Sequence, residues 1–473
     1  MLSRRRLLTL GAAAGATGLL AAAVPQSSVA ARSGASAAFT VPLPVPPVLE
    51  PALRTATHDI YRMTLKEADA RILPGVTTRV RSFDGQFPGP TIRARRGRPV
   101  VVQQVNELGT PVAVHLHGGH VPQASDGHPM DLIKPGGSRT YHYPNDQSAA
   151  TLWYHDHAHM LESENVYRGL SGLYVLTDEL EDLLPLPKGR YDVPLLLRDA
   201  KLAGDGALAY DVHDIAARGT TMVNGVSRPY LNVAARKYRF RLVNVSNDRV
   251  FAFRLSDGSR FTQIASDGGL LPAPVPMDSI GLWPAERAEI VVDFSSYAPG
   301  TQLVLENLAP YPGEDAQIMR FDVGGKVPDP SRVPEQLRPL PQPGKPTVER
   351  TFEMTTDMAH DRYLINGKEF DMDRVDIRPR LGVDEAWTVS VPAGNYAMPH
   401  TFHTHLAQFR VLERNGKPPA PEESGLKDTV PLVPGETVRL HVRFTTYTGR
   451  YIYHCHMMGH SALGMMGQME ITA

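Results

Sequence analysis

The only cysteine of this 473-residue chain, Cys455, lies directly between His454 and His456. His460 follows it by five residues and Met465 by ten. One cysteine cannot form an internal disulfide, so Cys455 serves as a metal ligand, serves as a nucleophile, or is incidental. In a strand, alternate residues face opposite sides, which places the thiol on one face and its two histidine neighbours on the other.

Histidines elsewhere in the chain form further pairs of the type His-x-His, and each pair presents two imidazole rings on one face of a strand. Two pairs lie in the first third of the chain and two near its end. The four pairs are His115 and His117, His155 and His157, His403 and His405, and His454 and His456. If the first and last parts of the chain pack together, these eight rings converge on several metal ions, because neutral imidazole is a common metal ligand.

A second metal site is predicted on the reverse face of the same strands. His400 lies at odd separations from His403 and His405, so an extended chain directs it to the opposite side. The predicted ligands of this second site are His400, Cys455, His460 and Met465. Two imidazoles, a thiolate and a weak thioether form the pattern of a blue-copper electron-transfer site, whereas a zinc site usually has four strong ligands or a bound water.

The two predicted sites are joined through the backbone, since Cys455 is bonded on either side to a histidine of the other site. Adjacent Cα atoms lie about 3.8 Å apart, which places the sites on the order of 10 Å from each other. A copper ion accepts electrons singly, and a cluster of several ions holds them until dioxygen takes four electrons and becomes two waters. The sequence therefore indicates a soft site that collects electrons beside a cluster that uses them.

Short β-strands are the elements that must position these residues. Runs rich in Val, Ile, Phe, Tyr and Thr alternate with turns, as in KYRFRLVNVS (237–246) and ETVRLHVRF (436–444), and the chain has 40 glycines and 41 prolines. Strands of this length at regular spacing predict an all-β fold of sandwiches or barrels. Hydrophobic residues make up 42% of the chain, which is enough for packed cores.

Changes in composition divide the chain into three predicted domains. A proline-rich stretch at 326–346 is typical of a semi-rigid linker, and a weaker boundary lies near residues 178–194. The expected order is an N-terminal signal at 1–35, a first domain at 36–180, a second domain at 181–325, the linker at 326–346 and a third domain at 347–473. The second domain has one histidine, His213, so the predicted ligands come from the other two domains.

The N-terminus carries the features of an export signal. The sequence SRRRLLTL (3–10) is a twin-arginine pattern, followed by an apolar run and by small residues near residue 30, where cleavage is expected. The apolar run is shorter than the ~20 residues of a membrane-spanning helix, so we expect export by the twin-arginine machinery, to the cell envelope or beyond, without stable membrane insertion. Lys and Arg number 49 against 50 Asp and Glu, which gives no electrostatic basis for binding nucleic acid.

The four histidine motifs, their order and their spacing resemble the multicopper oxidases, a family that includes laccases, bilirubin oxidases and copper efflux oxidases. The segment FDGQFPGPTIRARRG (83–97) is similar to the entry strand of the first domain in that family, and the first two histidine motifs look closest to bacterial spore-coat laccases. The resemblance covers essentially the whole chain after the signal. It implies three cupredoxin-like Greek-key domains and four copper ions.

The resemblance also implies a role for each ligand. A type 1 copper in the third domain would be held by His400, Cys455, His460 and Met465. A type 2 copper would be held by His115 and His403, one type 3 copper by His117, His155 and His456, and the other by His157, His405 and His454. Asp126 matches the acidic residue that helps to deliver protons near the trinuclear site, although an Asp in Ser-Asp-Gly also forms turns. Cys455 would carry electrons from the type 1 copper to that site.

Three residues depart from the family pattern. Thr401 stands where the third motif usually has proline, and Ser461 stands where bacterial laccases usually have a glutamate directly after the last type 1 histidine. The missing glutamate leaves the proton relay to Asp126 or to water. His159 continues the alternation of the second motif, although the family does not use this position as a ligand.

The expected function is that of a laccase-like oxidase, which takes single electrons from small phenols or aromatic amines and reduces dioxygen to water. A metallo-oxidase acting on Cu(I) or Fe(II) is the alternative, favoured by the 16 methionines but not by any long Met- and His-rich insertion. A copper-free envelope scaffold is the remote alternative, and it is disfavoured because all the ligand positions are present. A nucleophilic Cys455 with His454 as its base would leave the other histidines unexplained.

Overall fold

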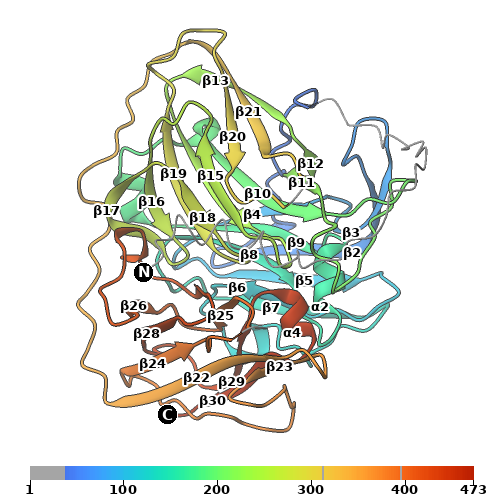
Figure 1. Ribbon diagram of the computed structural model, residues 1–473, viewed down its shortest axis with the longest axis vertical. Coiled ribbons are helices and arrows are strands. Elements are labelled where there is room, and N and C mark those ends of the chain that lie inside the picture. The colour runs from blue at the N-terminus through green and yellow to red at the C-terminus, as the bar shows by residue number, and fades with distance from the viewer. Residues whose placement is uncertain (1–37, 312–313, 395–396) are drawn as a thin grey trace, which may run out of the picture.

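The computed structural model describes residues 38–311, 314–394 and 397–473, which form mostly β-strands (Figure 1). The predicted all-β class is confirmed. The predicted twin-arginine signal at 1–35 lies outside the described residues and stays a prediction. Within the described part of the chain, no helix has the length and apolar character needed to cross a membrane.

The first β-sandwich is built from two sheets in the first third of the chain. One sheet contains β1 (Leu53–Arg54), β2 (Asp59–Ala70), β5 (Val100–Asn106) and β7 (Ser138–Tyr143) in that order, with β3 (Thr78–Phe83) paired to β2. The other contains β4 (Gly89–Arg95), β9 (Ser171–Thr177), β8 (Ala150–Asp156) and β6 (Val114–His117). Tyr61, Met63 and Leu65 of β2 are buried in the core between the sheets, as the two-residue period of a strand requires.

The middle β-sandwich is larger and has a core rich in phenylalanine, including Phe240, Phe253 and Phe321. Its wider sheet runs β12 (Val226–Ser227), β11 (Thr220–Val223), β10 (Asp192–Ala200), β14 (Lys237–Asn244), β19 (Arg287–Asp293), β16 (Phe261–Ser266) and β17 (Gly269–Met277). Its second sheet runs β13 (Tyr230–Ala235), β21 (Gln317–Lys326), β20 (Gln302–Asn307), β15 (Phe251–Leu255) and β18 (Ile280–Leu282).

The third β-sandwich lies in the C-terminal part of the chain. One sheet runs β23 (Arg362–Ile365), β22 (Val348–Asp357), β24 (Glu385–Ser390), β28 (Thr437–Val442) and β26 (Arg410–Arg414), and the other runs β27 (Thr429–Leu432), β25 (His400–Thr404), β29 (Gly449–Cys455) and β30 (Met466–Ile471). In β29, Tyr451, Tyr453 and Cys455 belong to the core of this sandwich. Ile452 and His454, at the alternate positions, are also buried, because the outer face of the strand is covered by a neighbouring sandwich.

Helices are short and few among the described residues. The α-helices are α2 (Glu162–Tyr167), α3 (Glu179–Leu183) and α4 (Met458–Ala462), and the 3-10 helices are η1 (Gln123–Ser125), η2 (Gly189–Tyr191) and η3 (Pro421–Glu423). Helix α2 of the first sandwich packs against α4 of the third (Figure 1). Helix α2 follows the predicted ligand His157 and helix α4 follows the predicted ligand His456, so this contact joins the segments after two ligands.

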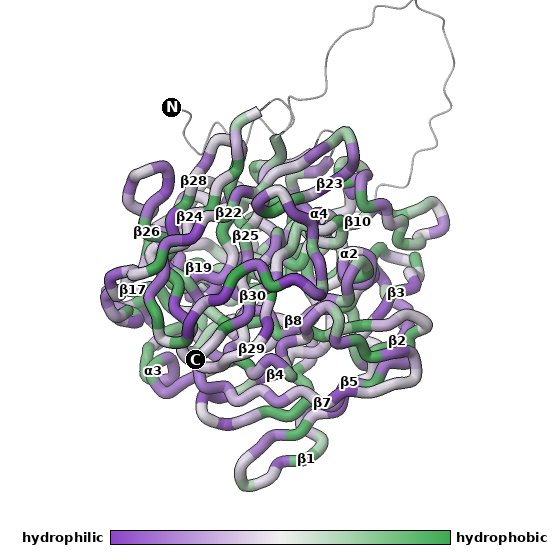
Figure 2. The backbone as a smooth tube through the Cα atoms, turned by 90° about the horizontal axis from the view of Figure 1, so that it is seen from below, coloured by the Kyte–Doolittle hydropathy of each residue, from purple (hydrophilic) through white to green (hydrophobic). Residues whose placement is uncertain are grey.

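The three sandwiches meet at a shared junction. Trp153 of the first sandwich, Val243 of the middle one and Met458 of the third belong to a single buried cluster. Figure 1 shows the middle sandwich above the third, with the segment between β21 and β22 running along the outside. Figure 2 shows hydrophobic and hydrophilic stretches intermixed along the chain, and each sandwich has a hydrophobic core of its own. The domain boundaries expected near residues 180, 325 and 347 stay predictions.

Candidate metal centre

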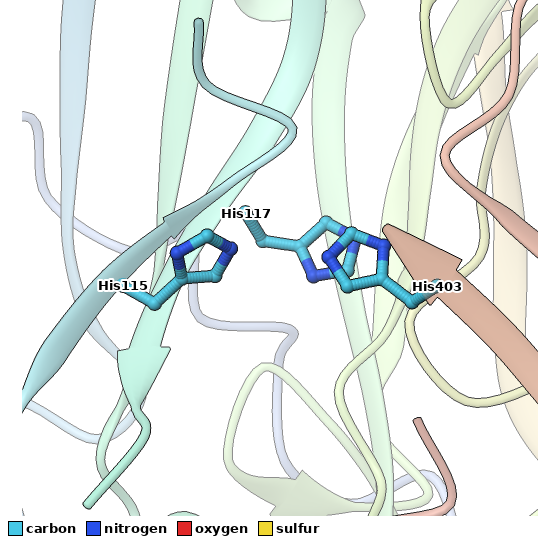
Figure 3. A group of neighbouring side chains, drawn as sticks. All are labelled: His115, His117 and His403. Carbon is cyan, nitrogen blue, oxygen red and sulfur yellow. The ribbon is translucent and has the colours of Figure 1, made fainter. Parts of the chain in front are cut away.

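Strand pairing places the predicted ligands side by side. In the first sandwich, β6 pairs with β8 so that His115 lies opposite His155. In the third sandwich, β25 pairs with β29 so that His403 lies opposite His454. The two sets meet where these sandwiches pack. The ring of His117 stacks on that of His403 with centroids 3.9 Å apart, and His115 lies beside them (Figure 3).

Six of the eight rings in this cluster are oriented by a hydrogen bond from one ring nitrogen, with donor–acceptor distances of 2.6–2.9 Å. The acceptors are the main-chain oxygens of Asp126 for His115, Asp156 for His155, Asp428 for His403 and Cys455 for His454, and the carboxylates of Asp428 for His117 and Asp126 for His405. A histidine whose outer nitrogen donates in this way has a free lone pair on its inner nitrogen. That is how metal-binding histidines are held in proteins.

The inner nitrogens form groups of three that fit metal ions. In each group the three nitrogens lie within 4.8 Å of one another, and the groups are His115, His117 and His403, then His117, His155 and His456, then His157, His405 and His454. Nitrogens bound to one ion at about 2.0–2.1 Å lie roughly 3–4 Å apart. The Nε2 atoms of His157 and His454 are 3.2 Å apart, which satisfies this condition. An all-imidazole donor set suits copper.

Burial keeps these rings neutral. It lowers the pKa of His155 to about 3 and that of His454 to about 4, because a charged imidazolium is disfavoured away from water. Burial and repulsion from neighbouring histidines lower the pKa of the other six rings well below its usual value. Neutral imidazole is the form that binds metal ions, so the cluster is ready to do so at ordinary pH.

The predicted second site lies on the reverse face of the same strands. Cys455 of β29 lies opposite Phe402 of β25, and His400, two residues from Phe402, shares its face. The Sγ atom of Cys455 is 3.7 Å from Nδ1 of His400 and 3.5 Å from Nδ1 of His460. The two Nδ1 atoms are 3.1 Å apart.

These three distances fit a single ion. With metal–nitrogen bonds of about 2.0–2.1 Å and a metal–sulfur bond of about 2.3 Å, tetrahedral ligands lie about 3.3–3.6 Å apart. Burial raises the pKa of the Cys455 thiol to about 12, so a bound cation must displace the proton, as metal ions do at coordinating thiols. Met465 is fully buried, and its carbonyl accepts the N–H of Cys455 at 3.0 Å. One thiolate and two imidazoles form a soft donor set that suits copper.

The three departures from the family pattern are placed as follows. Thr401 is buried in β25, where its carbonyl accepts the N–H of His456 at 2.8 Å. The hydroxyl of Ser461 donates to a carboxyl oxygen of Glu162 at 3.1 Å. His159 belongs to none of the metal-binding groups, and its ring lies 5.0 Å from that of Phe370. Strand β8 ends at Asp156, so the alternation that His159 continues in the sequence is not continued in space.

Asp126 bridges two ligands of the histidine cluster. Its carboxyl accepts from Nδ1 of His405 at 2.7 Å, and its carbonyl accepts from Nδ1 of His115 at 2.6 Å. Burial raises the pKa of this carboxyl well above its usual value, because the charged form is disfavoured away from water. The turn at Gly127 fixes this position, since its φ is +75° and a Cβ there would lie 2.2 Å from the carbonyl oxygen of Val114.

The middle sandwich offers none of the predicted ligands, but it holds two of them in place. Both terminal nitrogens of Arg287, at the start of β19, donate to the carboxylate of Asp428 at 2.6 Å. The same carboxylate accepts from His117, and the carbonyl of Asp428 accepts from His403. One aspartate of the third sandwich thus joins ligands of two sandwiches to an arginine of the middle one. Neither Arg287 nor Asp428 was identified from the sequence. The one indication in the sequence is that Arg287 begins the largely apolar strand β19.

Comparisons with known proteins agree with this geometry. Profiles of the multicopper oxidase family match residues 64–181, 197–310 and 341–473. A laccase from Bacillus subtilis strain 168 is 35% identical over 92% of this chain and 98% of its own. The crystal structure of a laccase from Pediococcus acidilactici Pa5930 matches with a TM-score of 0.85 at 34% identity, covering 91% of this chain and 94% of that one. A Campylobacter jejuni multicopper oxidase described as a metallo-oxidase has a TM-score of 0.81 at 25% identity, covering 92% and 96%.

Replacing Arg287 with methionine would leave the Asp428 carboxylate buried without its counter-charge. We expect the free energy of unfolding of the copper-free protein to fall by about 3–5 kcal/mol, as for other broken buried pairs. Urea denaturation measures this change, and metal analysis should show less copper bound per chain. Arg254→Met is the matched control, because it removes a partly exposed pair with Glu306 in the same sandwich and should cost less than about 1 kcal/mol. Equal losses in the two variants would contradict the assignment.

Proposed function

Because this chain belongs to the multicopper oxidase family, whose members are oxidoreductases that use dioxygen, we propose that it is a laccase-type enzyme. Its reductants would be small phenols or aromatic amines, each giving up one electron, and four such electrons would convert dioxygen into two waters. Cys455 carries this proposal: its sulfur belongs to the reverse-face site, while both of its sequence neighbours belong to the histidine cluster.

The proposed enzyme would hold four copper ions. His400, Cys455, His460 and Met465 would hold the type 1 ion, and His115 and His403 the type 2 ion. The type 3 ions would be held by His117, His155 and His456 and by His157, His405 and His454. Copper bound in these places supplies one-electron acceptance at the reverse-face site and the four-electron reduction of dioxygen at the cluster.

The protein's own residues keep the two sites close, dry and supplied with protons. The peptide bonds of Cys455 link the reverse-face site to the cluster, and every predicted histidine ligand is almost completely buried. Reduction of dioxygen to water consumes four protons, so acidic groups must lie within reach. Asp126 meets this need, because its carboxyl contacts His405 directly and its burial favours the protonated form.

A surface cavity of about 620 Å³ is the proposed reductant site. Phe370, in its wall, donates its N–H at 2.9 Å to the carbonyl of Gly464, which lies in the loop between His460 and Met465. Tyr363 stacks on the ring of His460 with centroids 4.6 Å apart. The cavity volume lies in the range of small-molecule sites, and an aromatic reductant seated there would lie beside the loop of the type 1 ligands.

Oxidation of a metal ion is the second candidate function, and the lining of the same cavity favours it. Asp371, Met372 and Asp373 all line the cavity, and Met372 is 45% exposed. Carboxylates and thioethers are ligands for Fe(II) and Cu(I), respectively.

Export by the twin-arginine machinery is the proposed route of this protein to the cell envelope or to the exterior. The sequence SRRRLLTL (3–10) supports it.

Replacing Cys455 with serine tests the link between the two sites. A hydroxyl cannot replace the soft thiolate, so we expect the blue absorbance at about 600 nm to disappear and turnover with a phenol to stop. Spectroscopy, copper analysis and an oxygen electrode measure these effects. The expected copper content is three ions per chain, against four in the parent. A variant that keeps full oxygen uptake would show that electrons do not pass through this sulfur.

Steady-state oxygen uptake on a panel of phenols, aromatic amines, Cu(I) and Fe(II) separates the two candidate functions. We expect higher kcat/KM for the organic reductants. The double variant Met372→Leu with Asp373→Asn should lower the rates with metal ions more than those with phenols, because it removes two possible metal ligands from the cavity wall. If metal ions are the better substrates and this variant loses only their oxidation, the metallo-oxidase assignment replaces the laccase assignment.

A further inference from the structure

Glu162, the first residue of α2, is a buried acid outside the predicted ligand set. Its side chain is 1% exposed. One carboxyl oxygen, Oε1, accepts the hydroxyl of Ser461 at 3.1 Å. The other, Oε2, is buried and has no hydrogen-bond partner among the described residues, and Glu162 forms no ion pair with them. A buried polar atom without a partner is costly, so its retention calls for a functional explanation.

The position of Glu162 relates it to both metal sites. Its main-chain N–H donates at 2.9 Å to the carbonyl of Ala158, which directly follows the cluster ligand His157. Its side chain reaches Ser461, which directly follows His460 of the reverse-face site. Helices α2 and α4 pack against each other at this contact (Figure 1). The carboxyl therefore lies between the loop that carries the cluster ligand His157 and helix α4, which carries the proposed type 1 ligand His460.

The chemistry of the cluster requires such a group. Dioxygen, four electrons and four protons give two waters, and the electrons come from four one-electron reductants. The protons must cross a shell of histidines whose side chains are at most 1% exposed. Burial and, to a smaller extent, the nearby Asp156 carboxyl raise the pKa of Glu162 to about 8, so the neutral acid predominates at pH 7. Asp156, on β8, is the titratable group whose charge acts on it among the described residues.

On the basis of the proposed oxidase function, we infer that Glu162 is a proton-transfer residue for the reduction of dioxygen at the histidine cluster. The O–H bond of its carboxyl breaks as the proton leaves toward the oxygen being reduced. The bond forms again with a proton taken from solvent, so the residue is unchanged after each transfer. Ser461 has no carboxyl, whereas bacterial laccases usually have a glutamate at this position. Glu162 instead places a carboxyl next to the hydroxyl of Ser461.

Reoxidation of the reduced protein tests this inference without any reductant. The copper-loaded protein is reduced fully in the absence of oxygen and then mixed with dioxygen, and the return of blue absorbance is followed in time. In the parent, the rate should fall as the pH rises through about 8, because the acid then loses its proton. Glu162→Gln should keep its copper and its rate of anaerobic reduction. Its reoxidation should slow by about 100-fold, a typical contribution of a general acid, and should no longer fall above pH 8.

Infrared difference spectra give a second measurement that does not depend on turnover. The resting parent protein at pH 7 should show a band from a protonated carboxyl that is absent from Glu162→Gln. Glu164→Gln is the matched control on the same helix, since the Glu164 carboxylate is partly exposed and paired with Arg168. This control should change neither the band nor the reoxidation rate.

An exchange of the two hydrogen-bonded side chains separates proton transfer from packing. The variant with Glu162→Ser and Ser461→Glu puts the carboxyl on the opposite side of the same contact and should restore most of the reoxidation rate. We expect this restored rate even if Glu162→Gln loses copper.

Two results would overturn the inference. One is a copper-loaded Glu162→Gln that reoxidises at the parent rate with the parent pH profile. The other is a copper-loaded exchange variant that remains as slow as Glu162→Gln. Failure of the parent itself to bind copper or to reoxidise would instead contradict the proposed function.

Discussion

The buried pair of Arg287 and Asp428 is the interaction on which the metal centre depends. The eight-histidine cluster lies between sandwiches that each have their own core. The distances between its rings therefore depend on how these sandwiches pack against each other. His117 and Asp428, 311 residues apart in the chain, meet in one hydrogen bond. Arg287 also donates to the carbonyls of Thr151 and Asp267, which offsets the cost of burying its charge. The middle sandwich thus aligns ligands that it does not contribute.

Much of the candidate site could be predicted because strands have a period of two. His454 and Cys455 had to face opposite sides of one strand, and the structure places them in two separate groups. His400 joins Cys455 for the same reason, at an odd separation from His403. A period of two applies only to residues within a strand. His159 has the correct parity in the sequence, but β8 has already ended, and the ring turns toward Phe370 instead.

The residues that the sequence did not reveal act across sandwiches. Arg287, Asp428 and Glu162 have no motif or spacing, because their partners lie far away in the chain and are fixed only by tertiary packing. Ser461 was visible as a departure from the family pattern, but its partner Glu162 emerged only when α2 and α4 were seen together. The overall all-β class was visible from composition, whereas the docking of three sandwiches around one centre was not. In the resulting arrangement the soft ligands come from the third sandwich, and both Asp126 and Glu162 come from the first.

Crystallographic anomalous scattering at the copper absorption edge would locate the bound ions. We expect one copper peak between Sγ of Cys455 and the Nδ1 atoms of His400 and His460. We expect three more among the inner nitrogens of the eight-histidine cluster. A fully loaded protein with no copper at the sulfur of Cys455, or with its copper bound outside these two groups, would contradict this expectation.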